Sequence, residues 1–241
     1  MFKGTRQAES DVATAERIRA EHLVGAQAKA QQLFDDVVGK GLLRPGVREC
    51  VLSKEVHELA YSKFGISRHW HKRIVRSGSN TIYPYRDNPP DRVIEPGDIL
   101  FLDFGPVFEE WEADFGRTYV LGDDPLKLRL CADLLPVWQA GKTFFDLNRY
   151  ITGAELYEHV RGEAKARGWE MTAPHAGHLI GEFPHERLPD EKRDCYIAPF
   201  NRLPLRRTDS RGSACHWILE VHLLEHQRRF GGFFEQLLTL P

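Results

Sequence analysis

The chain has 241 residues, a formal net charge of −2, 41% hydrophobic residues and 28% charged residues. This length suits one large domain or two small ones with a sizeable core, and the composition is ordinary for a globular protein. A near-neutral charge without a dense lysine and arginine block argues against a nucleic-acid partner, and no apolar run approaches the roughly 18 residues of a membrane span.

Cysteine usage and the N-terminal segment indicate the compartment. Cys50, Cys131, Cys195 and Cys215 are scattered and form no CxxC pair. This pattern argues against a zinc ribbon or a disulfide framework and suits a reducing environment. The first 22 residues are polar and lack the apolar core of a signal peptide. We therefore expect a soluble, cytoplasmic protein without a membrane partner.

Two helices are predicted at the start of the chain. Apolar residues at three- and four-residue spacing indicate one long helix over 7–38, which Gly39 ends. A second helix is expected over about 46–64, with Gly65 suited to its C-terminal cap. The long first helix is rich in alanine, and it could pack against a second copy of the chain as well as against its own core.

The pattern then changes to strands and turns. The runs "ILFLDFG" (99–105) and "EADFGRTYVLG" (112–122) are β-type and are joined around residues 108–110, which predicts a hairpin. Further helical patterns cover 125–140 and 143–167, and strand patterns cover 215–224 and 230–240. Helices grouped between strand hairpins predict an α+β fold in which helices cover one face of an antiparallel sheet.

Two aspartates mark the predicted hairpin. Asp103 follows an apolar strand run, and Asp114 lies in the second "DFG". If the turn centres near residues 108–109, the two side chains lie nearly opposite each other on one face, about 5 Å apart. Carboxylates this close repel each other unless divalent cations lie between them. The alternative is that one aspartate is a turn residue and the other an exposed polar position.

Later segments add imidazoles and carboxylates in unusual surroundings. The segment "PHAGHLIGEFPHE" places His175, His178 and His185 beside glycines that allow close approach of the backbone. Glu220 and Glu235 each lie inside an apolar strand pattern, where a carboxylate needs a partner. Carboxylates combined with imidazole favour Mn²⁺, Fe²⁺, Co²⁺ or Zn²⁺ over a thiolate site. Two such ions about 3.5–4 Å apart form the arrangement of two-metal hydrolases.

The order and spacing of these residues resemble the pita-bread metallopeptidases, which include the methionine aminopeptidases, aminopeptidase P and prolidase. The resemblance rests on "GDILFLDFG", "ADFGRTYVLG", "GHLIG", "ILEVHL" and "FFEQLL". It implies a curved antiparallel sheet covered by helices over residues 45–241, with residues 1–44 as an N-terminal helical extension. It implies a set of ligands for two divalent ions: Asp103, Asp114, His178, Glu220 and Glu235.

The resemblance also implies two catalytic roles. His185 lies seven residues after His178, and it matches the family's histidine that contacts the scissile amide and the tetrahedral intermediate. Glu220 matches the metal-bound glutamate that carries a proton from the bridging water to the leaving amine. A carboxylate and an imidazole beside a polarised carbonyl are suited to this proton transfer.

One family residue is replaced in this chain. A substrate-binding histidine usually precedes the first aspartate strand, but here Tyr83 or Tyr85 is nearest to that place. A tyrosine donates a hydrogen bond but carries no imidazolium charge. Tyr83, Tyr85 and His175 are therefore the candidate substrate-binding residues. His69 and His71, in the nearby "RHWHK", are an alternative replacement for the missing histidine.

The sequence favours a dinuclear metal hydrolase that cleaves a small peptide or amide bond, similar to an Xaa-Pro dipeptidase or aminopeptidase. Its cofactors would be two Mn²⁺, Co²⁺, Fe²⁺ or Zn²⁺ ions. One alternative keeps the fold and metals but acts on a non-peptide C–N bond or as a lyase. Another is a non-catalytic binding module. The partners expected are a small substrate and a second copy in a homodimer, with no nucleic acid.

Overall fold

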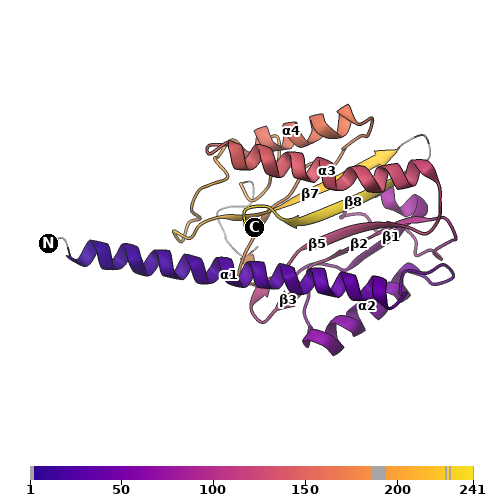
Figure 1. Cartoon of the computed structure of the whole chain (residues 1–241), viewed down its shortest axis with the longest axis horizontal. Coiled ribbons are helices and arrows are strands. Elements are labelled where there is room, and N and C mark those ends of the chain that lie inside the picture. The colour runs from indigo at the N-terminus through magenta and orange to yellow at the C-terminus, as the bar shows by residue number, and fades with distance from the viewer. Residues whose placement is uncertain (1–2, 186–193, 226, 228, 241) are drawn as a thin grey trace.

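The computed structural model describes residues 3–185, 194–225, 227 and 229–240. Six of its strands form one antiparallel sheet in the order β1-β2-β5-β8-β7-β6, and β3 and β4 form a separate small hairpin (Figure 1). The elements are α1 (Lys3–Gly39), α2 (Glu49–Phe64), β1 (Ile74–Ser77), η1 (Gly78–Ile82), β2 (Ile99–Phe104), β3 (Val107–Phe108), β4 (Trp111–Glu112), β5 (Phe115–Val120), α3 (Pro125–Leu147), α4 (Gly153–Ala166), β6 (Leu179–Ile180), β7 (His216–Glu225) and β8 (Phe230–Leu237).

The predicted helices and strands are present, but one helix boundary was wrong. The sequence pattern divided α3 from α4 at residues 141–142, whereas the chain stays helical well beyond that point. The division comes later because Thr152 caps α4. Its hydroxyl accepts a hydrogen bond from Glu155 N, and the Glu155 carboxylate accepts one from Thr152 N. This capping box starts α4 where hydrophobic spacing alone gave no signal.

The strands separate a helix-covered face from an open one. Successive side chains on a strand point to opposite faces. On β2, Leu100 and Leu102 are buried in the core shared with α1 and α2, whereas Phe101 and Asp103 line a pocket on the other face. The same alternation continues on the neighbouring strands, and it places one face of the sheet in the core and the other around the pocket.

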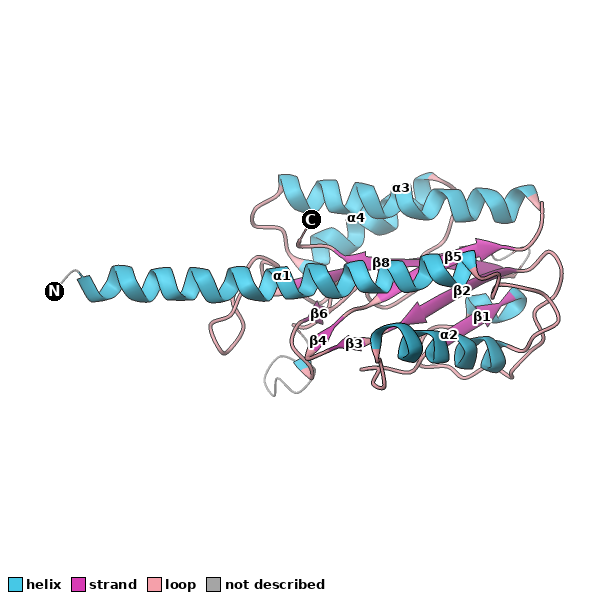
Figure 2. Cartoon of the chain, turned by 60° about the horizontal axis from the view of Figure 1, so that its bottom comes forward, coloured by secondary structure: helices cyan, strands magenta, loops and turns pink. Residues whose placement is uncertain are grey.

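The four α-helices of the described ranges, α1 to α4, cover the same face of the sheet, as expected from the sequence (Figures 1 and 2). Phe115 belongs to the core under α1 and α2, and Phe234 to the core under α3 and α4. The Arg117 guanidinium lies between these rings, 3.7 and 3.9 Å from their centroids. The two cores therefore meet on one side of the sheet, and the opposite, concave side is left for the pocket.

Helix α1 combines a projecting part with a packed part. Its N-terminal part extends beyond the rest of the molecule in Figures 1 and 2. From Glu16 onward it contacts the body, since the Glu16 carboxylate lies 2.7 Å from His216 Nε2. Further along, Leu33 and Phe34 are buried against α2 and the sheet. The division into an extension over 1–44 and a domain over 45–241 stays a prediction.

The packing of α1 leads to a stability prediction. Phe34 is 1% exposed and packs edge to face against Phe104 and Phe115. Phe34→Ala is expected to lower the free energy of unfolding by about 3–5 kcal/mol, because it removes buried surface and leaves a cavity. Urea unfolding measures this loss. Val38→Ala, at a 51% exposed position of the same helix, is the control and should change the value by less than about 0.5 kcal/mol. Equal effects of the two substitutions would contradict this packing.

Candidate metal centre

Three carboxylates lie in one row across the concave face. The strand register pairs Asp103 with Gly116, Gly116 with Glu235, and Glu235 with Glu220. Paired residues of antiparallel strands point to the same face, so the row crosses β2, β5, β8 and β7. At Gly116 a Cβ atom would lie 2.5 Å from the Phe233 ring and 3.1 Å from Glu235 Cβ. Glycine is therefore needed in the middle of the row.

Asp114 completes what we call the carboxylate cluster: Asp103, Asp114, Glu220 and Glu235. The predicted hairpin is present, but Gly116, not Asp114, lies opposite Asp103. The register differs because the connection itself folds into the β3–β4 hairpin. Asp114 still enters the cluster, since it lies two residues before Gly116 and so on the same face. Sequence reasoning thus identified the residue but not its position in the register.

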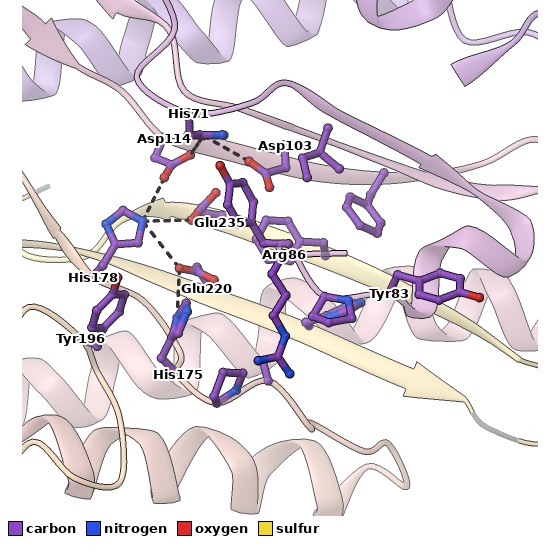
Figure 3. Close-up of a pocket in the computed structure, with 18 of the residues that line it drawn as sticks. His71, Tyr83, Arg86, Asp103, Asp114, His175, His178, Tyr196, Glu220 and Glu235 are labelled. Carbon is purple, nitrogen blue, oxygen red and sulfur yellow. Dashed lines mark hydrogen bonds and ion pairs between the residues drawn. The ribbon is translucent and has the colours of Figure 1, made fainter. Parts of the chain in front are cut away.

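The Asp114 carboxylate lies between two histidines, as Figure 3 shows. Its Oδ1 is 3.0 Å from His71 Nε2, and its Oδ2 is 3.1 Å from His178 Nε2. His178 Nε2 is also 3.6 Å from Glu220 Oε1 and 4.0 Å from Glu235 Oε1. The structure therefore brings all five predicted ligands together. It adds His71, which the sequence offered only as a substitute for a substrate-binding residue.

Burial governs the protonation of three of the carboxylates. Removal from water disfavours the ionised form, and it raises the pKa of Asp103 to about 7 and that of Glu220 to about 8. Burial also raises the pKa of Glu235, with further contributions from the neighbouring carboxylates. Asp114 differs, because burial is outweighed by the two flanking histidines, which hold its pKa well below the usual range.

The contacts that lower the pKa of Asp114 raise the pKa values of the two flanking imidazoles. Burial disfavours the imidazolium form of His71, but Asp114 and Asp103 outweigh it and raise the pKa to about 9. Burial likewise opposes charge on His178, but its hydrogen bond to Asp114 prevails and raises the pKa to about 9. His175 has no such hydrogen bond, and burial lowers its pKa to about 4. Without metal, the cluster is thus held together by shared protons.

The donor set fits divalent cations. Side-chain exposure is only 3% for Asp114 and Glu235, 11% for Asp103 and 14% for Glu220. Glu235 Oε2 is buried and has no hydrogen-bond partner among the described residues. An orphaned carboxylate oxygen inside a set of buried carboxylates is costly without a cation. Carboxylate and imidazole ligands together suit borderline transition metals such as Mn²⁺, Co²⁺ and Zn²⁺.

His185 lies beside this centre and is held by a residue that sequence reasoning missed. Its ring stacks on His178 at 5.9 Å and contacts Trp70 at 5.1 Å. The Glu112 carboxylate accepts hydrogen bonds from His185 N, at 3.2 Å, and from its Nδ1. The signal for Glu112 was its spacing of two from Asp114, which places both on one side of extended chain.

The predicted substrate-binding residues line the pocket, which encloses about 600 Å³. His175 Nδ1 lies 3.6 Å from Glu220 Oε1, and its ring packs on Tyr196. Tyr85 is 49% exposed, and its ring meets that of His71 at 5.7 Å. Tyr83 lies at the far end of the pocket from the carboxylate cluster (Figure 3). All three residues therefore line the same pocket as the carboxylate cluster.

His69 and His71, left open together by the sequence, are separated by the structure. His71 points at the carboxylate cluster, as described above. The His69 ring instead packs between His57, at 5.3 Å, and Phe104, at 5.9 Å. Burial lowers the pKa of His69 to about 3, so this ring is neutral. His69 is half-buried and, unlike His71, is not among the residues that line the pocket, so it does not replace the missing substrate-binding histidine.

The fold and this centre together define a pita-bread protein of the metallopeptidase type. The model of metallopeptidase family M24 matches residues 21–207, and the chain belongs to that family. Among curated proteins, the uncharacterised peptidase YqhT of Bacillus subtilis is 26% identical over 172 residues, which are 70% of this chain and 48% of the relative.

Solved structures confirm the fold. The X-Pro aminopeptidase from Thermotoga maritima superimposes with a TM-score of 0.72 at 20% identity, over 95% of this chain and 65% of that chain. The methionine aminopeptidase from Rickettsia prowazekii gives 0.61 at 15% identity, over 90% of each chain. The chain spans less than half the length of the curated relatives it matches. No helix in the described ranges combines the length and apolarity needed to cross a bilayer.

Proposed function

We propose that the chain is a metal-dependent hydrolase that cleaves a small peptide or amide bond, with Xaa-Pro dipeptides as the leading substrates. The observation that carries this proposal is the convergence of the five predicted ligands, with Asp114 at their centre. The name of the Thermotoga maritima neighbour supports the Xaa-Pro preference. The scattered cysteines support a cytoplasmic location, and a homodimer stays a prediction.

Charge balance supports two cations in place of one. The carboxylate cluster carries four negative charges when it is fully ionised, and two divalent cations balance them if the flanking histidines are neutral. Such cations, when bound, polarise a substrate carbonyl and lower the pKa of water. The residues that would hold them are Asp103, Asp114, His178, Glu220 and Glu235. Manganese or cobalt is the proposed identity, since these ligands are oxygen-rich.

Glu220 is the proposed carrier of the proton that the leaving amine needs. Its Oε1 lies 3.6 Å from both His175 Nδ1 and His178 Nε2. A carboxyl group surrounded by a buried strand is protonated more readily than one exposed to water, and Glu220 has such surroundings. A carboxyl group that gains and loses a proton near neutral pH is suited to general acid–base catalysis.

His185 is the proposed hydrogen-bond donor to the substrate. A carboxylate can only accept hydrogen bonds, so the contact with Glu112 places a hydrogen on His185 Nδ1. The other nitrogen, Nε2, is then the one available to a substrate in the pocket that His185 lines. A second hydrogen, on Nε2, would let the ring donate to a substrate carbonyl. Glu112 is thus a positioning residue for His185.

The rest of the pocket supports a small, partly charged substrate. Tyr83, Tyr85 and His175 are the proposed substrate-binding residues. The Arg86 side chain also reaches into the pocket, as Figure 3 shows. A guanidinium in this place is suited to pair with a substrate carboxylate, such as the C-terminus of a dipeptide. The apolar walls include Phe101 and are suited to a ring such as that of proline.

Metal analysis combined with a dipeptide panel tests the proposal. The purified chain is loaded with Mn²⁺ or Co²⁺, its metal content is measured by mass spectrometry, and Xaa-Pro, Met-Xaa and Ala-Xaa dipeptides are offered. We expect two ions per chain and preferential cleavage of Xaa-Pro. Two ions without cleavage of any peptide would favour the non-peptide C–N substrate or lyase alternative. A chain that binds no metal under any loading would contradict the proposal and favour the binding module.

A further inference from the structure

His71 and His178 are held in the same way on the two sides of Asp114. In each ring Nδ1 lies 2.7 Å from the carbonyl oxygen of the following residue, Lys72 or Leu179. In each ring Nε2 faces one of the two oxygens of Asp114, at 3.0 and 3.1 Å. His178 is one of the ligands expected from the sequence. The matching geometry indicates that the two histidines have the same role in the centre.

The backbone contact defines how the His71 ring can act. A carbonyl oxygen only accepts hydrogen bonds, so Nδ1 carries a hydrogen. In the neutral ring Nε2 then carries a lone pair, and this lone pair is directed at carboxylate oxygens of Asp114 and Asp103. Such an arrangement is repulsive unless a proton or a metal cation lies between the groups, and a bound metal takes the place of the proton. It is the arrangement of metal-binding histidines, whose second nitrogen donates to a carbonyl or carboxylate.

The distances around His71 are those of ligands that share one ion. Metal–nitrogen and metal–oxygen bonds are about 2.0–2.2 Å long, so neighbouring ligand atoms of one ion lie about 3.0–3.5 Å apart. His71 Nε2 is 3.0 Å from Asp114 Oδ1 and 3.5 Å from Asp103 Oδ1. The ligand atoms of these three residues all lie within 4.8 Å of one another.

The surroundings of His71 hold it in place. The neighbouring Trp70 donates from Nε1 to the Ala113 carbonyl at 3.1 Å, and its backbone N donates to the Gly105 carbonyl at 2.9 Å. A Cβ atom at Gly105 would lie 2.3 Å from His71 Cδ2. The imidazole thus occupies space that only a glycine at position 105 leaves open. The segment is fixed to the sheet beside both aspartates, and the ring has little freedom to turn away.

We propose that His71 is a sixth protein ligand, which completes one cation position together with Asp103 and Asp114 Oδ1. His178, Glu220, Glu235 and Asp114 Oδ2 serve the other position. This inference rests on the proposed pair of cations. The resemblance implies a centre with one imidazole ligand, His178, for two cations. With His71 as a further ligand, each cation position has one imidazole. A nitrogen ligand at the Asp103 position favours Co²⁺ or Zn²⁺ there more than an all-oxygen position does.

X-ray absorption spectroscopy of the cobalt-loaded chain tests this assignment, because scattering from imidazole carbons counts the metal-bound histidines. We expect two ions per wild-type chain and, on average, one imidazole per ion. In His71→Gln we expect half an imidazole per ion. Titration calorimetry should show that one of the two ions binds at least about tenfold more weakly in this variant.

His69→Gln is the matched control, since His69 lies two residues away with its ring packed between His57 and Phe104, and this variant should retain both ions and both imidazoles. Circular dichroism confirms that each variant is folded, and the wild-type spectrum gives the imidazole count without any variant. Two ions with half an imidazole per ion in the wild type would overturn the His71 assignment and leave the proposed function intact. A wild-type chain that binds no metal would overturn both.

Discussion

Replacement of Asp114 by asparagine is expected to reduce bound metal from two ions per chain to at most one and to lower hydrolysis at least about 10³-fold. Each Asp114 oxygen faces a different histidine, so both proposed cation positions depend on this one side chain. Asparagine has nearly the same shape, but it has no charge and only one oxygen. The substitution therefore removes a ligand without opening a cavity.

Metal content by mass spectrometry and the rate of dipeptide cleavage measure the two effects. Asp146→Asn is a suitable control, because Asp146 lies on the surface of α3 and pairs with Lys142. It changes the net charge of the chain by the same amount but lies outside the pocket. If Asp114→Asn kept two tightly bound ions, the centre would not be built around Asp114, and the proposed ligand assignment would be wrong.

The second large effect is an opposite pH dependence of stability with and without metal. Between about pH 7 and 9 the metal-free chain is expected to lose stability as the pH rises. In the unfolded chain Glu220 is already ionised in this range, whereas its folded pKa is about 8. His71 and His178 keep their protons to about pH 9 when folded but lose them near 6.5 when unfolded. The folded state binds more protons, so the free energy of unfolding falls with pH.

Each of these groups contributes a slope of at most about 1.4 kcal/mol per pH unit. His69, His175 and His222 are neutral throughout this range, because burial lowers their pKa values far below it, and they add no slope. Bound metal displaces the protons from its ligands, so metal affinity, and with it stability, rises with pH. The two states should therefore diverge between pH 7 and 9.

Urea unfolding in chelator and in excess Co²⁺, at pH 7, 8 and 9, measures this divergence. The metal-free midpoint should fall over the range while the loaded midpoint stays level or rises. His71→Gln should show a shallower fall without metal, because one titrating group is gone. Parallel curves for the two states would mean that the cluster does not exchange protons for metal, and that would contradict the proposed centre.

The carboxylates on strands could be predicted from the sequence because their signal is local. Asp103, Glu220 and Glu235 each interrupt an apolar run, and burial of a charge in such a run requires a partner. The hairpin pattern also predicted that Asp103 and Asp114 lie on one face. The exact register did not follow, because the β3–β4 hairpin between the two aspartates is too short to give a hydrophobic pattern of its own.

The roles of His71 and Glu112 could not be predicted in the same way. His71 reaches the centre only because Trp70 bonds to the backbone at Gly105 and Ala113, contacts that no local pattern encodes. Glu112 follows two other glutamates and resembles an exposed turn. The β3–β4 hairpin buries it completely, with Glu112 N bonded to the Gly181 carbonyl. Contacts between distant segments, rather than propensity, decide both positions.

The projecting part of α1 separates the N-terminus from the chemistry. The helix before Glu16 adds roughly 20 Å of length, at about 1.5 Å per residue, and it leaves from the helix-covered face (Figures 1 and 2). The pocket opens on the other side of the sheet. Helix α1 thus acts as a spacer: a tag, an anchor on a solid support or another domain joined at this end would be held clear of the substrate's path.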